Sequence, residues 1–143
     1  MSDSANVFHW PVRIYWEDTD AGGIVFYANY LKFFERARTE WLRHLGINQQ
    51  SLRETTGGMF VVSASQVNYL RPARLDDLLS VSAHLSDVAR ASMTITQAAH
   101  RADPIHGDVR LCEGSIRIGW VNAQTLRPDR IPASVVAALQ GKH

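Results

Sequence analysis

The sequence contains a single cysteine, Cys112, among its 143 residues, so no disulfide can form within the chain. An unpaired thiol is typical of a protein from a reducing compartment. Charge of one sign is not in excess either, because 15 basic and 14 acidic residues leave a net charge of +1. A nucleic-acid or membrane-binding surface would need a basic face. We therefore expect no nucleic-acid partner and at most a peripheral association with membranes.

Long apolar runs are missing as well. No stretch approaches the roughly 18 apolar residues of a membrane span. The first ten residues, MSDSANVFHW, lack the basic segment followed by an apolar one that marks a signal peptide. These features predict a cytoplasmic protein. Because repeats and low-complexity segments are also lacking, we expect a single domain over residues 1–143.

Two hydrophobic periodicities divide the chain. Residues 12–16 alternate and are rich in strand-forming types, which predicts a first strand. Between residues 28 and 45 the apolar positions recur at steps of three and four, which predicts a long helix that ends before Gly46 and carries its charged side chains mostly on the outer side. Further strands are expected at residues 59–69, 78–88, 92–100 and 110–121. A short helix should follow Pro132, over residues 133–139. This order is typical of an α+β domain in which the long helix packs on an antiparallel sheet.

The stretch EDTDAGGIVFYANY, residues 17–30, connects the predicted first strand to the long helix. Asp18, Asp20 and Gly23 match positions 1, 3 and 6 of a calcium-loop template, but its positions 5 and 12 are glycine and asparagine here. The segment before the loop is strand-like, whereas such a loop needs a helix on both sides. A phosphate-binding loop would need a third glycine, or a lysine followed by serine or threonine. We expect neither a calcium site nor a nucleotide site.

Other common catalytic and metal-binding patterns are lacking too. The six histidines are scattered along the chain, and Cys112 falls within a predicted strand, where a small buried apolar role suits it. The sequence has no G-x-S-x-G elbow and no cysteine–histidine signature of a hydrolase. Neither a metal ion nor a redox cofactor is expected.

The same stretch suits acyl transfer. A helix that begins near residue 28 exposes free backbone amides and carries a partial positive charge of about half a unit at that end. Such an end stabilises negative charge on a carbonyl oxygen under attack, and Gly22 and Gly23 would let a substrate approach the backbone closely. Asp18 or Asp20 could act as nucleophile or general base. Either one could equally serve only as a cap of the loop or of the helix.

A family resemblance covers most of the chain. The residues RIYWEDTDAGGIVFYANYL from Arg13 and FERARTEWL from Phe34 resemble the 4-hydroxybenzoyl-CoA thioesterase family of hot dog folds. The likeness continues through YLRPARLDDLL from Tyr69 and through residues 90–92. Within the family it is strongest to the bacterial acyl-CoA thioesterases associated with the Tol–Pal system of the cell envelope.

This resemblance implies a fold and an assembly. A hot dog fold has a long central helix wrapped by a curved antiparallel β-sheet, in agreement with the predicted order of elements. Family members form homodimers whose sheets join edge to edge, and these often pair into a homotetramer with active sites at the subunit interface. The implied activity is hydrolysis of acyl-CoA to a free acid and CoA.

The resemblance also assigns catalytic roles. The second aspartate of the family's D-x-D pair is catalytic, and it corresponds to Asp20. A backbone amide at the helix start polarises the thioester carbonyl, and it corresponds to the N–H of Tyr27. Asp18 is then expected to order the loop.

Contacts to the substrate and to CoA are implied at Gly23, Arg90 and Ser92. Arg71 and Arg74 are further basic candidates for the phosphates of CoA.

Tyr27 is also where the sequence departs from the Tol–Pal-associated branch, many members of which have histidine there. The backbone amide would serve equally well, but the tyrosine occurs in the aromatic-CoA branch, so the sequence leaves aromatic and aliphatic acyl groups both open. Phe26, Tyr27 and Tyr30 are candidates either for an acyl pocket or for the core.

Two other functions remain open from the sequence. A dehydratase of the same fold usually needs a histidine in its site, and no histidine lies between residues 10 and 43. The second alternative is a scaffold with weak or vestigial hydrolysis, which would bind acyl carrier protein or phospholipid-synthesis enzymes. A thioester of the carrier protein is also open as the substrate, in place of CoA.

Overall fold

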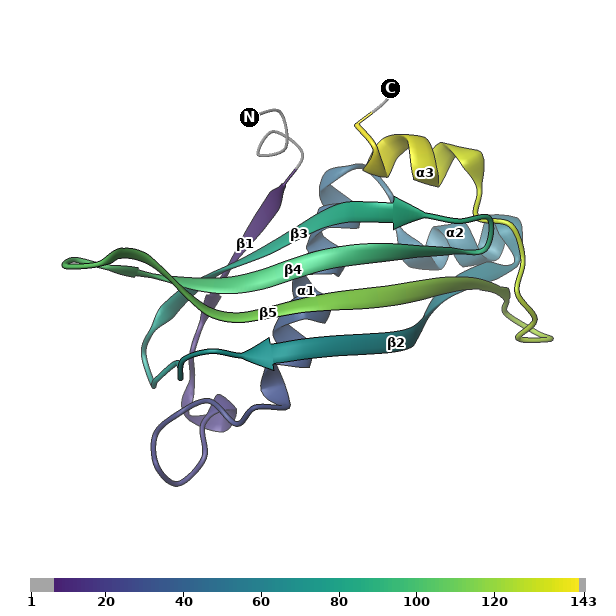
Figure 1. Cartoon of the computed structure of the whole chain (residues 1–143). Coiled ribbons are helices and arrows are strands. Elements are labelled where there is room, and N and C mark those ends of the chain that lie inside the picture. The colour runs from purple at the N-terminus through teal and green to yellow at the C-terminus, as the bar shows by residue number, and fades with distance from the viewer. Residues whose placement is uncertain (1–6, 142–143) are drawn as a thin grey trace.

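The computed structural model describes residues 7–141, which form one antiparallel sheet crossed by a long helix (Figure 1). The strands are β1 (Phe8–Arg13), β2 (Gly58–Tyr69), β3 (Leu78–Val88), β4 (Ser92–Asp103) and β5 (Gly107–Asn122). The helices are α1 (Asn29–His44), α2 (Gln49–Thr56) and α3 (Ala133–Leu139). The predicted α+β class is therefore confirmed.

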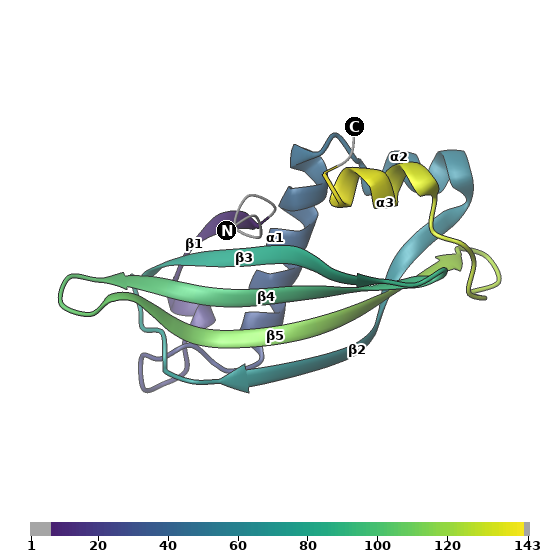
Figure 2. The ribbon, with the colours of Figure 1, turned by 45° about the horizontal axis from the view of Figure 1, so that its top comes forward.

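The five strands follow the order β1-β3-β4-β5-β2, and all neighbouring pairs are antiparallel. The sheet curves around α1, and α2 and α3 lie toward the end of the sheet where β2 begins (Figures 1 and 2). β1 and β2 are the two edge strands. Within residues 7–141, no helix is both long and apolar enough to cross a bilayer.

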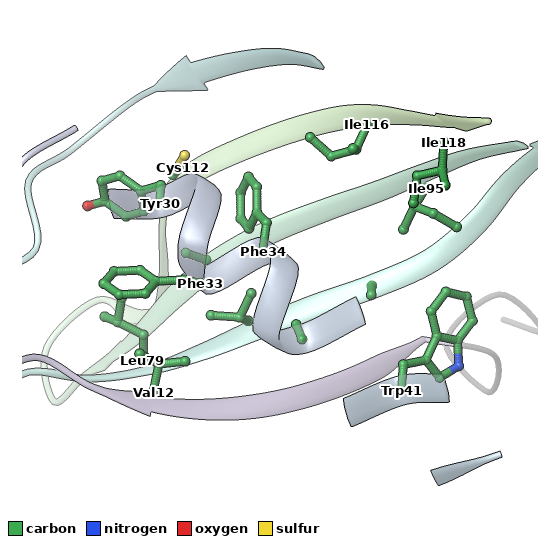
Figure 3. Packing of buried hydrophobic residues seen from close by; sticks show 14 of the residues in the cluster. Val12, Tyr30, Phe33, Phe34, Trp41, Leu79, Ile95, Cys112, Ile116 and Ile118 are labelled. Carbon is green, nitrogen blue, oxygen red and sulfur yellow. The ribbon is translucent and has the colours of Figure 1, made fainter. Parts of the chain in front are cut away.

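α1 packs on the sheet through a continuous apolar face. The side chains of this face are at most 5% exposed and include Tyr30, Phe33, Phe34, Ala37 and Trp41 (Figure 3). They meet buried residues of β3, β4 and β5, among them Cys112, which is fully buried as expected. Burial raises the pKa of the Cys112 thiol to about 12. The helix is one residue shorter at each end than the predicted range 28–45.

The end of α1 follows the predicted pattern. Gly46 has a φ of +82°, a conformation that glycine adopts without strain. Its amide donates to Arg43 O at 2.9 Å, and the amide of Ile47 donates to Leu42 O at 2.8 Å. These two bonds satisfy carbonyls of the last turn and turn the chain away from the helix axis.

The first strand lies earlier than the predicted residues 12–16. β1 covers Phe8–Arg13 and pairs with β3, whereas Trp16–Asp18 form a 3₁₀ turn. Pro11 has no backbone N–H, so it argues against a central strand. It is tolerated here because β1 is an edge strand with a neighbour on one side only.

Two further differences concern the second half of the chain. The sequence predicts a loop that holds Gly57 and Gly58 between the long helix and the next strand, but α2 occupies most of this connection and ends at Gly57, whose φ is +75°. β4 and β5 are also longer than the predicted residues 92–100 and 110–121, because they continue into a hairpin. In its turn, Asp103 Oδ1 accepts hydrogen bonds from two backbone amides, at 2.8 and 3.0 Å.

Candidate functional site

Asp20 lies in a tight turn between β1 and α1. Its amide donates to Ile24 O at 2.9 Å, and its carbonyl oxygen accepts from the amide of Gly23 at 3.0 Å. Gly23 has a φ of +79°, which disfavours residues that carry a side chain. A Cβ atom at Gly22 would lie only 3.3 Å from Asp20 Oδ1. The backbone of the turn that presents Asp20 thus favours glycine at residue 23, and a side chain at residue 22 would press on the Asp20 carboxylate.

Asp18 is an internal support of this loop. Its side chain is buried, and Oδ2 accepts a hydrogen bond from the amide of Tyr15 at 2.9 Å. Its backbone carbonyl accepts from the Phe26 amide at 3.1 Å and from Asn29 Nδ2 at 2.8 Å. Asp18 therefore joins the segment before the turn to the start of α1, the loop-ordering role expected for it.

The carboxylate of Asp20 is exposed to solvent. Its Oδ1 accepts from the Gly22 amide at 2.9 Å, which fixes the side chain close to the turn. Within residues 7–141, no hydrogen-bond donor lies against Oδ2. One carboxylate oxygen is therefore held and the other is available to a substrate or a water molecule.

The start of α1 has free backbone donors. No side chain caps it, and the amides of Asn29, Tyr30 and Leu31 donate to carbonyls three residues earlier, at 2.9 to 3.3 Å. The amides of Tyr27 and Ala28 donate to no acceptor in the part of the chain that the structure describes. Unpaired amides at the positive end of a helix are suited to bind an anionic or polarised oxygen.

Aromatic side chains surround the start of α1. The Tyr27 ring is 61% exposed and lies 4.9 Å from the ring of Phe26 and 5.7 Å from that of Tyr69, measured between centroids. Tyr30 differs, because it is 3% exposed, packs on Phe33 and accepts a hydrogen bond from the Ala73 amide. Burial raises the pKa of the Tyr30 phenol. Phe26 and Tyr27 therefore remain candidates for an acyl pocket, whereas Tyr30 belongs to the core.

Tyr69 was not expected from the sequence, because it follows Phe26 by more than forty positions and lies in a different predicted element. The chain after Tyr69 also packs on the Asp20 turn. The amide of Leu75 donates to Gly23 O at 3.2 Å, and Ile24 forms a β-bridge with Arg74. Of the basic candidates for CoA, Arg74 is therefore the one that the structure brings next to this turn.

Arg90 and Ser92 lie at the other end of the sheet. Ser92 begins β4 and lies across β5 from Val61 of β2. Tyr69, whose ring contacts the start of α1, follows Val61 by eight positions along β2, which is about 27 Å at 3.4 Å per residue. A single chain thus does not bring Arg90 or Ser92 together with Asp20.

A groove runs along α1 on the side of β2. Its cavity volume is about 290 Å³ near the start of the helix, where Leu31 lines it, and about 110 Å³ farther along. Glu35, Arg38 and Val62 line both parts. Leu31 lies one helical turn after Tyr27, but neither Asp20 nor Tyr27 lines either part of the groove.

Arg38 contacts the core of the protein, which the pattern of charged residues in α1 did not predict. Its Nη1 donates to Gln97 Oε1 at 2.8 Å, and Gln97 is 1% exposed in the core between α1 and the sheet. Burial lowers the pKa of the guanidinium. The sequence carries no signal for this, because Arg38 stands among other charged residues of the same helix.

No metal centre is found within residues 7–141, since no three histidine, cysteine, aspartate or glutamate side chains gather closely enough to hold an ion. Burial raises the pKa of the Tyr69 phenol.

Comparison with known proteins gives consistent results. The family model of the thioesterase superfamily matches residues 22–106. The chain is 40% identical over 134 residues to the acyl-CoA thioester hydrolase YbgC of Escherichia coli O6:H1, an alignment that covers 94% of this chain and 96% of that protein. It is 41% identical over 133 residues to the acyl-CoA thioesterase YbgC of Haemophilus influenzae, with 93% and 94% covered.

The fold is shared with a solved thioesterase. The 4-hydroxybenzoyl CoA thioesterase from Pseudomonas sp. strain CBS-3 superposes with a TM-score of 0.84 at 18% identity, over 92% of this chain and 98% of that one. At this identity the likeness concerns the fold. The hot dog fold expected from the sequence is therefore confirmed.

Proposed function

Because the chain belongs to the thioesterase superfamily, we propose that it hydrolyses the thioester of acyl-CoA to a free acid and CoA, with Asp20 as its catalytic carboxylate. The observation that carries this proposal is that one loop holds two kinds of group without partners in the described part of the chain. A carboxylate oxygen of Asp20 and the amides of Tyr27 and Ala28 lack partners within residues 7–141, and the same loop holds both.

The proposed mechanism follows from the charges of these groups. The thioester carbonyl oxygen accepts hydrogen bonds from the free amides, which stabilise the negative charge that develops when the carbonyl carbon is attacked. Asp20 either attacks that carbon itself or takes a proton from the water that does so. The carbon–sulfur bond then breaks, and CoA leaves as a thiolate that takes up a proton, from Asp20 on the general-base path or from water on the nucleophilic one. On the nucleophilic path, water then hydrolyses the anhydride between the acyl group and Asp20 to the free acid. Gly22 and Gly23 keep the turn free of side chains where the substrate approaches.

The first test is thiol release from acetyl-, octanoyl-, palmitoyl- and benzoyl-CoA by the wild type and by Asp20→Asn. Asparagine keeps the size and the hydrogen-bond acceptor that Gly22 needs, but it removes charge and basicity. We expect a loss of roughly 10²-fold or more in kcat, as for other lost acid–base or nucleophilic groups. The preferred ester would decide between aliphatic and aromatic substrates.

Asp108→Asn is the matched control, because Asp108 is exposed and pairs with Ala102 in the β4–β5 hairpin, ten positions along β4 from Ser92. It should keep the wild-type rate. Equal rates for Asp20→Asn and the wild type would show that Asp20 is structural and that this mechanism is wrong.

For CoA, we propose contacts at Gly23 and Arg74 of one chain and at Arg90 and Ser92 of a second copy. Support comes from the geometry of the β2 edge. If β2 pairs antiparallel with β2 of a second chain, the beginning of one strand lies next to the end of the other. The end of the sheet that carries Ser92 would then lie on the same side as the Asp20 turn of the partner. A homodimer of this kind is therefore part of the proposed function.

A further inference from the structure

The loop that carries Asp20 is a short antiparallel hairpin beside the start of α1 (Figure 1). At its base the amide of Phe26 donates to Asp18 O at 3.1 Å, and an antiparallel β-bridge lies between this base and the tight turn that Asp20 begins. Tyr27 and Ala28 follow the base directly, and their backbone amides have no acceptor within residues 7–141. The base of the hairpin therefore lies between the Asp20 turn and the free amides along the chain.

Asn29, the first residue of α1, is attached to the same base. Its Nδ2 donates to Asp18 O at 2.8 Å, and its backbone amide donates to Phe26 O at 2.9 Å. Asp18 O therefore accepts two hydrogen bonds, one from the residue on each side of Tyr27 and Ala28. One carbonyl oxygen thus holds both ends of the segment that carries the free amides.

Capping of the helix does not explain this asparagine. An asparagine stabilises a helix start when its side-chain oxygen accepts a hydrogen bond from a backbone amide of the first turn. No side chain caps α1, and Asn29 Oδ1 accepts no hydrogen bond in the part of the chain that the structure describes. Asn48 at the start of α2 shows the contrast, because its Oδ1 accepts from the Ser51 amide at 2.9 Å. Asn29 instead acts as a donor, which an ionised aspartate cannot do.

Other bonds hold the hairpin on its far side. The amide of Val25 donates to Ala73 O at 2.8 Å, and the amide of Leu75 donates to Gly23 O at 3.2 Å. Among the described residues, Asn29 is the one residue of α1 whose side chain bonds to the hairpin directly. Loss of its donor should therefore leave the hairpin folded but less firmly placed against the helix start.

We propose that Asn29 is a positioning residue, whose bond to Asp18 O sets the distance between the Asp20 carboxylate and the free amides at the helix start. The inference rests on the proposed function, in which both groups act on one thioester carbonyl. Asn29 acts through Asp18 and does not touch the reacting atoms. Its effect is expected to be large, because a misplacement of about 1 Å in such a site can cost roughly 10²-fold in rate.

The test is kcat and KM for the preferred ester with Asn29→Ala and Asn29→Asp. Alanine removes the donor without adding charge, whereas aspartate keeps the size and an oxygen that could cap the helix but cannot donate. We expect both variants to lower kcat at least about tenfold, with KM changed less than about threefold, because binding groups are kept and the reacting geometry is not. Asn48→Asp is the matched control. The bond of Asn48 needs only an acceptor, so this variant should keep the wild-type kcat.

Combination with Asp20→Asn separates positioning from a general structural role. If Asn29 acts through the placement of Asp20, Asn29→Ala should lower kcat less than about threefold once the carboxylate is removed, because residues that act as a unit are not additive. An equal loss in both backgrounds overturns the proposal. Urea unfolding accompanies each assay, and Asn29 variants that are unfolded under assay conditions would assign Asn29 to the stability of the fold and overturn the proposal as well.

Failure of this inference differs from failure of the proposed function. If the wild type hydrolyses an ester and Asn29→Ala does so at the same rate, only the positioning role of Asn29 is overturned. If the wild type hydrolyses no ester, or if Asp20→Asn is as fast as the wild type, the proposed function and its mechanism fail, and this inference fails with them.

Discussion

Asp18 and Asp20 lie two positions apart, yet their carboxylates have different surroundings. Asp18 is 8% exposed and accepts a hydrogen bond from the amide of Tyr15, so it acts within the loop. Asp20 is exposed, and only one of its oxygens is held, by the amide of Gly22. The same side chain thus supports the loop at one position and faces solvent at the other.

This difference predicts that Asp18→Ala and Asp20→Asn affect stability and activity in different ways. Asp18→Ala removes the charged acceptor of a partly buried hydrogen bond from the Tyr15 amide, so we expect the free energy of unfolding to fall by about 1–2 kcal/mol. Activity should fall with it, because the Asp20 turn loses its support. Asp20→Asn should lose activity with nearly unchanged stability. Urea unfolding followed by tryptophan fluorescence, combined with the thiol-release assay, separates the two. A stable but inactive Asp18→Ala would instead place Asp18 in the chemistry.

Spacing alone could not distinguish these two aspartates, because D-x-D places both in the same loop. The resemblance to thioesterases favoured Asp20, and the hydrogen bonds of Asp18 agree with the supporting role that remained for it. Arg38 and Tyr69 were missed for another reason. Their roles depend on contacts with residues far away in the sequence, Gln97 for Arg38 and Tyr27 for Tyr69, and no local pattern indicates such contacts.

At the scale of elements, the sequence best predicts those helices and strands whose buried apolar residues recur at a regular spacing. α1 was predicted within one residue at each end because its apolar face is continuous. α2 was missed because none of its residues is buried, so its sequence shows no apolar period. Its start is marked only by Asn48, whose Oδ1 accepts from the amide of Ser51. β1 was predicted too late in the chain because Pro11 is atypical of a strand interior. Proline is accepted here because β1 lies at the edge of the sheet.

The contact between β2 and β5 gives a prediction at this scale. A methyl group at Gly58 would overlap the indole ring of Trp120, which is 2% exposed and stacks edge-on against Phe60. We expect Gly58→Ala to lower the free energy of unfolding by about 1–3 kcal/mol, as overpacking does elsewhere. Thermal unfolding by circular dichroism measures this.

Gly119→Ala is the matched control in β5, since a methyl group there would have its nearest neighbour at 3.7 Å, an ordinary contact. It should change stability little, because it adds no overlap and lowers the entropy of the unfolded chain. If the two variants unfold at the same temperature, contact with Trp120 is not the reason that residue 58 is glycine.

At the scale of the whole molecule, the fold class could be predicted from the order of helices and strands, whereas the oligomeric state could not. β2 is an edge strand of twelve residues, and its middle, from Val62 to Gln66, is exposed. An unpaired edge of this length is a template for pairing with another strand. Its residues are mostly small or polar, so nothing in their pattern distinguishes an edge that faces water from one that pairs with a second chain.

Pairing through β2 predicts a homodimer that depends on this edge. Light scattering should give the wild type at least twice the chain mass of 16.0 kDa. Ala64→Asp places a carboxylate in the middle of the exposed run of each copy, where like charges on paired strands repel, so we expect its mass to fall toward that of one chain and its activity to fall with it. Thr125→Asp, in an exposed turn, is the control and should change neither. A fully active monomer would contradict the proposed CoA site, because one chain keeps Ser92 and Asp20 at opposite ends of the sheet.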